Sequence, residues 1–292
     1  MIYTLLAATC WASVNIIDKY TLSNLVKSPL IPIFILSLVG LISGIFILAL
    51  NNFPTMAPVD LILALVAGAL YLVVMFFYYQ AVKQEEISRV IPLYYLSPVF
   101  VLLGSWLFLS ESVTKIELIA ILLLVFGAIF ISIKPGKNLV HNKAALYMLL
   151  ASIVYAGNQI VTKFLLNSNQ FWTVFAYGRI GLLITLAPIL YLKRREIKES
   201  FQNLSYPPIA IMSFNQVLNV SGIFLITIAL TKAYAGLVNG LASVQPLLVL
   251  VISTLLSIFL PNIIKENIER KELGRKLLAL VAILAGTFLI SG

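Results

Sequence analysis

The sequence predicts an all-α integral membrane protein whose ten transmembrane helices form two inverted five-helix repeats. Hydrophobic residues make up 61% of the chain and charged residues only 11%, whereas roughly a quarter of the residues of a soluble domain are charged. Apolar runs of about 20 residues, long enough to cross roughly 30 Å of hydrocarbon, recur along the whole length. Finally, the stretches 69–132 and 222–291 share one layout.

That layout is an apolar helix, a short turn, an apolar helix with a proline inside it, and an apolar helix that contains a glycine near its end. The prolines are Pro98 in the first stretch and Pro246 in the second, and 17 positions separate Ala81 from Pro98 and Ala229 from Pro246. Because a proline frees a carbonyl and softens its helix, we expect Pro98 and Pro246 to act as hinges.

The hydrophobic pattern places helices at roughly 2–20, 29–50, 59–82, 89–110, 114–133, 143–166, 170–192, 208–231, 235–260 and 272–291. The first repeat is expected to comprise residues 1–137 and the second residues 138–292. Each half holds five spans, an odd number, so the second half enters the membrane from the opposite side. Inverted repeats of this kind place a substrate site near the bilayer midplane, between the halves.

The charge and cysteine content bear on whether the chain forms a disulfide, binds nucleic acid or holds a cofactor. The first apolar segment lacks a basic n-region and is expected to be a retained helix, and the single cysteine, Cys10, excludes an internal disulfide. The net charge of +9 lies mainly in short connectors, where basic residues set membrane orientation, so no nucleic acid is expected. The sequence also offers no metal framework, so no cofactor is expected.

Basic residues are distributed unevenly between the two sides. Of the 20 lysines and arginines, only Lys115, Lys163 and Lys232 lie in the even-numbered connectors, and Arg179 lies inside a span. The positive-inside rule therefore predicts that both termini face outside. The expected location is the cell membrane, as a multi-pass protein of the prokaryotic inner-membrane type.

The helices that open the two halves also match. Residues 11–20 align without gaps on residues 155–164, and in both an aromatic residue is followed by an amide four positions later and by a lysine after four more. Four-residue steps keep all three on one helix face. We interpret the stripe as the lining of a cavity, and packing between helices is the alternative.

Polar side chains inside a bilayer are costly and generally face the bundle interior or a water-filled cavity. We therefore expect amide, phenol and indole side chains in the spans to bind the substrate. These are Trp11, Asn15, Tyr78, Tyr94, Tyr155, Asn158, Gln159, Asn215, Asn219, Asn239 and Gln245. Gln80, Tyr95 and Gln216 are of the same kind. For any one of them, interhelical hydrogen bonding is the structural alternative.

Charged side chains in the spans are few. Arg179 either extends to the near surface or faces the pathway and pairs with a substrate carboxylate or phosphate. Asp18 is expected to form a local pair with Lys19 at the membrane boundary. With no carboxylate expected deep in a span, proton coupling is disfavoured, and facilitated diffusion or exchange is favoured. No P-loop is present, so ATP hydrolysis is not expected.

With these features in hand, the chain resembles the drug/metabolite transporter superfamily, in its ten-helix branch with two EamA-type halves. The resemblance covers essentially all 292 residues, and the stretch from Ala81 to Ser132 carries it, above all Tyr95-Leu-Ser-Pro98-Val-Phe, Leu107-Phe-Leu-Ser-Glu111 and Gly127. The second half keeps Gln245-Pro246 and Gly286, but departs after Phe259, where about eleven residues are inserted. Relatives in this branch are usually drawn with cytoplasmic termini, the reverse of the charge-based prediction.

These observations together favour a secondary transporter, not driven by ATP, that moves a small polar or aromatic metabolite by alternating access. A lipid-carrier flippase is the alternative in the same class. An intramembrane enzyme would need paired acids, a catalytic dyad or metal ligands, and the sequence offers none convincingly. The expected partners are a small-molecule substrate and the lipid bilayer, with the chain as a monomer or homodimer.

Overall fold

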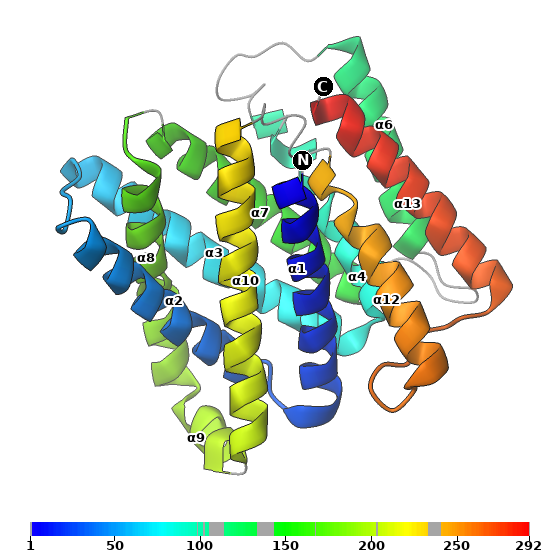
Figure 1. Ribbon diagram of the computed structural model, residues 1–292, viewed down its shortest axis with the longest axis horizontal. Coiled ribbons are helices and arrows are strands. Elements are labelled where there is room, and N and C mark those ends of the chain that lie inside the picture. Colours follow the sequence, from blue (N-terminus) through cyan, green and yellow to red (C-terminus); the bar gives the residue numbers. More distant parts are fainter. Residues whose placement is uncertain are drawn as a thin grey trace.

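The computed structural model describes residues 2–97, 99–101, 103–104, 114–132, 143–166, 168–202, 204–232 and 241–291. Within these ranges the chain is a helical bundle (Figure 1). Its α-helices are α1 Ile2–Tyr20, α2 Leu30–Leu50, α3 Pro58–Gln84, α4 Ile87–Tyr94, α6 Lys115–Ser132, α7 Lys143–Leu166, α8 Phe171–Leu192, α9 Arg194–Gln202, α10 Tyr206–Lys232, α12 Gln245–Phe259 and α13 Arg270–Ser291. A π-helical turn, η1 Thr21–Leu25, continues α1.

The length and composition of the helices confirm the predicted class of membrane protein. Five helices of the described chain are long and apolar enough to span a bilayer: α2, α3, α7, α8 and the part of α10 from Tyr206 to Ile226. The count of ten spans stays a prediction. The short polar helix α9 was not predicted, because the sequence there was read as a connector.

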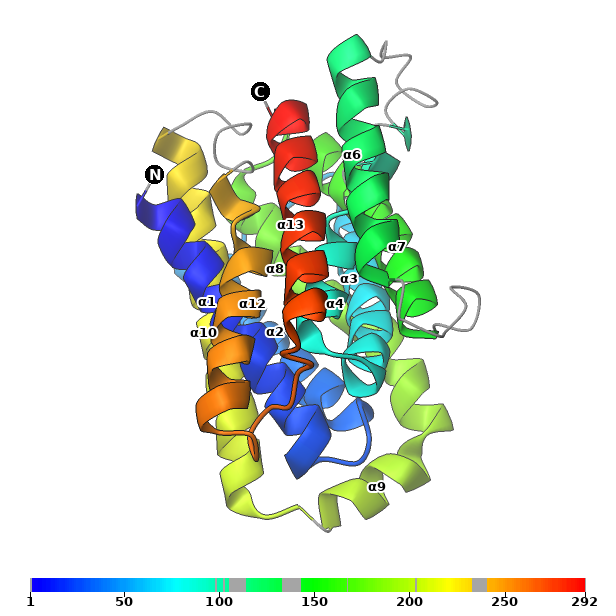
Figure 2. The ribbon, with the colours of Figure 1, turned by 90° about the vertical axis from the view of Figure 1, so that its right-hand side faces the viewer.

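Both termini lie at one end of the bundle, and α9 lies at the other end (Figures 1 and 2). Because α8 leads into α9 and α13 leads to the C-terminus, α8 begins at the end that carries the termini and α13 begins at the end that carries α9.

Most of the extensive helix contacts join the first half of the chain to the second. α1 packs against α10, α3 against α7 and α8, α2 against α8 and α10, and α6 against α13. α12 contacts both α1 and α4, and α4 also contacts α7. Figure 1 shows α1 beside α10, and Figure 2 shows α6 beside α13. The halves are therefore interleaved rather than set side by side as separate bodies.

The α6–α13 pair has a reciprocal contact at two glycines. A Cβ atom added to Gly127 on α6 would lie 2.8 Å from the carbonyl oxygen of Ala279, and one added to Gly286 on α13 would lie 2.8 Å from that of Ala120. Small residues of this kind let membrane helices approach closely. Each helix thus presents its glycine to the backbone of the other.

We expect Gly286→Ala to lower the thermal unfolding midpoint in detergent, because its methyl group would press on helix backbone; overpacking costs typically about 1–3 kcal/mol. Gly274→Ala on the same helix is the matched control, since a Cβ there meets nothing within 4 Å. It should leave the midpoint unchanged or raise it slightly, because alanine favours the helix. Equal midpoints for the two variants would contradict the close packing.

Two helices are interrupted at matching places in the repeats. α4 ends at Tyr94 and is followed by a turn at Tyr95–Leu96, while a turn at Ser243–Val244 precedes α12. Pro246 thus lies buried in the first turn of α12, and the prediction that it lies inside one helix over 235–260 is wrong. A proline in the first turn costs no backbone hydrogen bond. Pro98 lies outside the described residues.

Buried ion pairs connect the helices at the α9 end of the bundle. Lys276 on α13 is 1% exposed and its Nζ lies 2.9 Å from Glu266 Oε2 and 2.7 Å from Glu86 Oε2. Arg89 contacts Glu272 and lies 3.2 Å from the same oxygen of Glu86. Connector charges that were read only as orientation signals therefore also tie the α3–α4 turn to α13 and the segment before it.

Glu86 makes this network sensitive to acid. Partial burial acts to raise the pKa of its carboxyl, but the hydrogen bond and charge of Lys276, a backbone N–H of Asn267 and the charge of Arg89 outweigh it, so its pKa lies below the ordinary 4.5. A carboxyl whose pKa is lowered in the folded state adds stability above its ordinary pKa and loses it as the pH falls through the lowered value. We expect the unfolding midpoint to fall on acidification through this window, less steeply in Glu86→Gln. Identical slopes would contradict this.

Candidate functional site

A buried carboxylate lies at the centre of the polar side chains of the bundle. Asp18 on α1, 4% exposed, accepts a hydrogen bond from Asn215 Nδ2 on α10 at 2.7 Å and one from the Tyr78 hydroxyl on α3 at 3.1 Å. Asn15 Nδ2, one turn earlier on α1, donates to the same hydroxyl at 2.8 Å. Asn15 and Asp18 are three residues apart and so share one face of α1.

The chain of hydrogen bonds continues to the two helix interruptions. Gln245 Nε2, at the start of α12, donates to Asn15 Oδ1 at 2.6 Å. The Tyr95 hydroxyl, from the turn after α4, lies 3.1 Å from both Gln245 Oε1 and the carbonyl oxygen of Ala242. Polar groups of α1, α3, α10 and both interrupted segments therefore form one connected cluster, called here the central cluster.

One acceptor of the central cluster is not used. Asn215 Oδ1 is buried and has no hydrogen-bond partner among the described residues. Buried polar atoms in native structures almost always have a partner. An acceptor left open beside a carboxylate is suited to a donor group of a solute.

Two further predicted residues lie along the same stretch of α10. Gln216 Nε2 lies 3.4 Å from the Tyr79 hydroxyl, and Asn219 Nδ2 lies 3.5 Å from Gln216 Oε1. These contacts are longer than those made by Asn215. Trp11 packs against α10 as well: a Cβ added to Gly222 would lie 2.7 Å from Trp11 Nε1. Trp11 thus fills the α1–α10 contact beside the central cluster.

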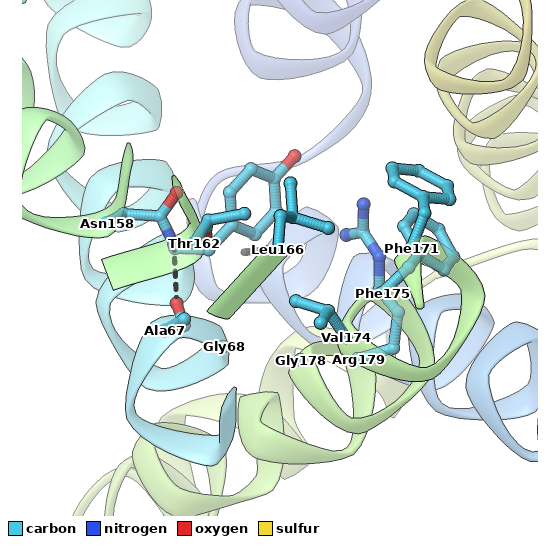
Figure 3. Close-up of a pocket in the computed structure, with 11 residues that line it drawn as sticks. Ala67, Gly68, Asn158, Thr162, Leu166, Phe171, Val174, Phe175, Gly178 and Arg179 are labelled. Carbon is cyan, nitrogen blue, oxygen red and sulfur yellow. Dashed lines mark hydrogen bonds between the residues drawn. The ribbon is translucent and has the colours of Figure 1, made fainter. Parts of the chain in front are cut away.

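A cavity of about 130 Å³ lies between α3, α7 and α8 (Figure 3). Its lining consists of Ala67, Gly68, Tyr71, Asn158, Thr162, Leu166, Phe171, Val174, Phe175, Gly178 and Arg179. Asn158 Nδ2 donates to the carbonyl oxygen of Ala67 at 2.7 Å, which fixes the amide in the wall. Tyr94 and Tyr155 form a separate ring contact, with centroids 4.8 Å apart.

Arg179 faces this cavity. Its guanidinium carbon lies 4.6 Å from the centroid of the Phe175 ring and 5.0 Å from that of Tyr71, and Figure 3 shows the group among the aromatic side chains of the wall. The guanidinium of Arg179 therefore lies in the wall of this cavity. That the cavity belongs to a transport pathway stays a prediction.

One prediction about the first helices of the halves is wrong, and another stays a prediction. The side chain of Gln159 is exposed on α7, whereas its neighbour Asn158 is buried, and the binding role of Gln159 is the one that stays a prediction. Asp18 is enclosed rather than part of a boundary pair, and Lys19 Nζ instead donates to the carbonyls of Val82 and Glu85, at 2.8 and 2.7 Å. Asn239 lies outside the described residues.

Asp18 is also the residue that sequence reasoning missed. No carboxylate was expected deep in a span, whereas the carboxylate of Asp18 is buried inside the bundle. The signal that could have found it was present: Asp18 lies three residues after Asn15 and seven after Trp11, spacings that keep it on the predicted polar face of α1.

Comparison with protein families gives a match between residues 1–133 and the model described as "EamA-like transporter family". The match covers the first of the two expected repeats and just under half of the 292 residues. This family is part of the drug/metabolite transporter superfamily, which confirms the resemblance over residues 1–133. The EamA-type character of the second half stays a prediction. Members of this family are membrane transporters, and the long apolar helices of this chain fit a multi-pass membrane protein.

The chain also matches solved structures. One, titled "Crystal structure of protein", is 14% identical with a TM-score of 0.59, and the match covers 99% of this chain and 94% of that one. At this identity the likeness concerns the fold alone. A search of curated proteins finds no match.

Proposed function

We propose that this EamA-like transporter moves a small polar or aromatic metabolite by alternating access, through a pathway between two inverted five-helix repeats. The observation that carries the proposal is the central cluster, in which Tyr95 and Gln245 join the interruptions of two matching helices. Transporter sites are often built from discontinuous helices of this kind, whose ends leave backbone groups for the solute.

The pairing of the helices supports the inverted arrangement. If each helix is replaced by its counterpart in the other half, the α1–α10 contact becomes the α7–α3 contact, and the α1–α12 contact becomes the α7–α4 contact. All four contacts exist. The two glycine contacts of α6 and α13 exchange in the same way. An isologous contact, in which each partner uses the same surface, is what a two-fold axis requires.

The ion pairs at the α9 end fit one state of such a cycle. They link the α3–α4 turn of the first half to α13 of the second, and so hold the halves together at that end. In the proposed cycle these pairs separate when access changes sides, while the chain bends at the turns Tyr95–Leu96 and Ser243–Val244. We infer from the positive-inside rule that the α9 end faces the cytoplasm.

The proposal is tested by uptake into proteoliposomes with a panel of amino acids, nucleobases, organic acids and sugar phosphates, with and without a pH gradient. Saturable uptake of one class that requires the protein supports the proposal. Absence of uptake and of exchange for every class would overturn it. Acceleration by the gradient that is lost in Asp18→Asn would assign proton coupling to this carboxylate.

A further inference from the structure

Arg179 is a half-buried cation that has no counter-ion among the described residues. It lies eight residues into α8, about 12 Å along the helix, and its described contacts are the faces of Tyr71 and Phe175. An ionisable side chain inside a span is costly and normally has a partner of opposite charge. Aromatic faces attract a cation but do not neutralise it.

The rest of the cavity wall contains no acidic side chain among its described lining residues. Besides Arg179, its polar side chains are Tyr71, Asn158 and Thr162, and the remainder are apolar or aromatic. The carboxylate of Asp18 already accepts two hydrogen bonds in the central cluster. The cavity therefore offers a negative group a partner of opposite charge, and its described lining offers an ammonium group none.

The size of the cavity limits the body of the ligand. Its volume of about 130 Å³ is close to that of an engineered cavity of about 150 Å³ that binds benzene. Phe171 and Phe175 stack with centroids 5.9 Å apart on the same side of the cavity, and Tyr71 lies in its wall. This space suits one ring or a short apolar chain.

We propose that this cavity binds a small organic monoanion, with its carboxylate on the Arg179 guanidinium and its ring or short chain among the aromatic side chains. The inference rests on the proposed function for its transport role and names the class of substrate. It predicts a preference for anions over neutral molecules of equal shape, and for both over cations and zwitterions.

The test is binding to the purified full-length protein in detergent, measured by calorimetry with five probes: benzoate, benzamide, benzylamine, phenylalanine and inorganic phosphate. We expect benzoate to bind about 10- to 100-fold more tightly than benzamide, the range that a charge-assisted hydrogen bond supports. Benzylamine and phenylalanine should bind more weakly still. Equal binding of benzoate and benzamide would overturn the proposal, as would phosphate binding as tightly as benzoate, which would mark a site for free inorganic anions.

Variants then assign the effect to the residue. Arg179→Gln should remove the preference for benzoate over benzamide, and Arg179→Lys should keep the preference with lower affinity, because lysine keeps the charge but not the planar donors. Arg194→Gln is the matched control, since that exposed guanidinium also lies over a tyrosine ring, at 6.0 Å, but outside the cavity. An unchanged preference in Arg179→Gln would overturn the assignment. Should that variant not fold, the comparison of benzoate with benzamide on the natural protein decides alone.

The binding and uptake measurements distinguish a failure of the proposed site from a failure of the proposed transport. Benzoate bound through Arg179 without any uptake would leave the site standing and count against the proposed transport. Uptake of neutral or zwitterionic solutes that is insensitive to Arg179→Gln would leave the transport standing and overturn the monoanion site.

Discussion

Replacing Lys276 with methionine is expected to lower the free energy of unfolding by about 3–5 kcal/mol, the range seen when one partner of a buried ion pair is removed. The cause is the carboxylate that remains. Glu266 Oε2, 2.9 Å from Lys276 Nζ, also accepts from the Ser88 hydroxyl, and it would keep its charge in a buried place with its cation gone.

The measurement is the unfolding transition of the purified protein in mixed micelles. Lys271→Met is the matched control, because this lysine lies on the same helix but is exposed, and its loss should change the transition little. The double variant Lys276→Met with Glu266→Gln should recover part of the loss, since it removes the uncompensated charge. A single variant as stable as the natural protein would contradict the burial of this pair.

Replacing Asn15 with alanine is expected to reduce transport by at least about 100-fold while the protein still folds. Asn15 is the one described side chain that joins Tyr78 to Gln245. Its loss would disconnect the α1–α3 part of the central cluster from the interrupted helices and leave two buried groups short of a partner, each at about 1–3 kcal/mol.

Uptake into proteoliposomes and the unfolding midpoint should be measured on the same preparation. Ser13→Ala is the control on the same helix, because its hydroxyl donates only to the carbonyl of Thr9 one turn earlier. Asn219→Ala should have a smaller effect than Asn15→Ala, since its one described contact is 3.5 Å long. Undiminished uptake by Asn15→Ala would remove the central cluster from the pathway.

The helices could be predicted from the sequence because long apolar runs can satisfy their backbone groups in a bilayer only as helices. α2, α3, α7 and α8 accordingly begin and end within about two residues of the prediction. The repeat also located the interrupted helices. It could not locate the interruption itself, because the proline that starts α12 reads equally well as a proline inside a longer helix.

The residue types of the site could be predicted from the sequence, but the contacts between these residues could not. Asn15, Tyr78, Asn215 and Gln245 were chosen one by one as buried amides and phenols, and the structure brings them together. What they surround, Asp18, was assigned to its neighbour in sequence because an adjacent lysine is the simplest partner. Helix geometry explains why Asn158 and Gln159 differ in burial: neighbouring residues differ by about 100° around the axis, so their side chains leave α7 in different directions.

The pairing of α6 with α13 has a consequence for how the protein is made. Between the end of α6 at Ser132 and the start of α13 at Arg270 lies nearly half of the polypeptide, and ribosomes add about 5–20 residues per second. The newly inserted α6 therefore lacks its partner α13 for roughly ten to thirty seconds, until the last segment emerges. Over that time the groove on α6 at Gly127, where α13 packs, stays uncovered. During that interval an insertion chaperone, or another copy of the nascent chain, can compete for the groove.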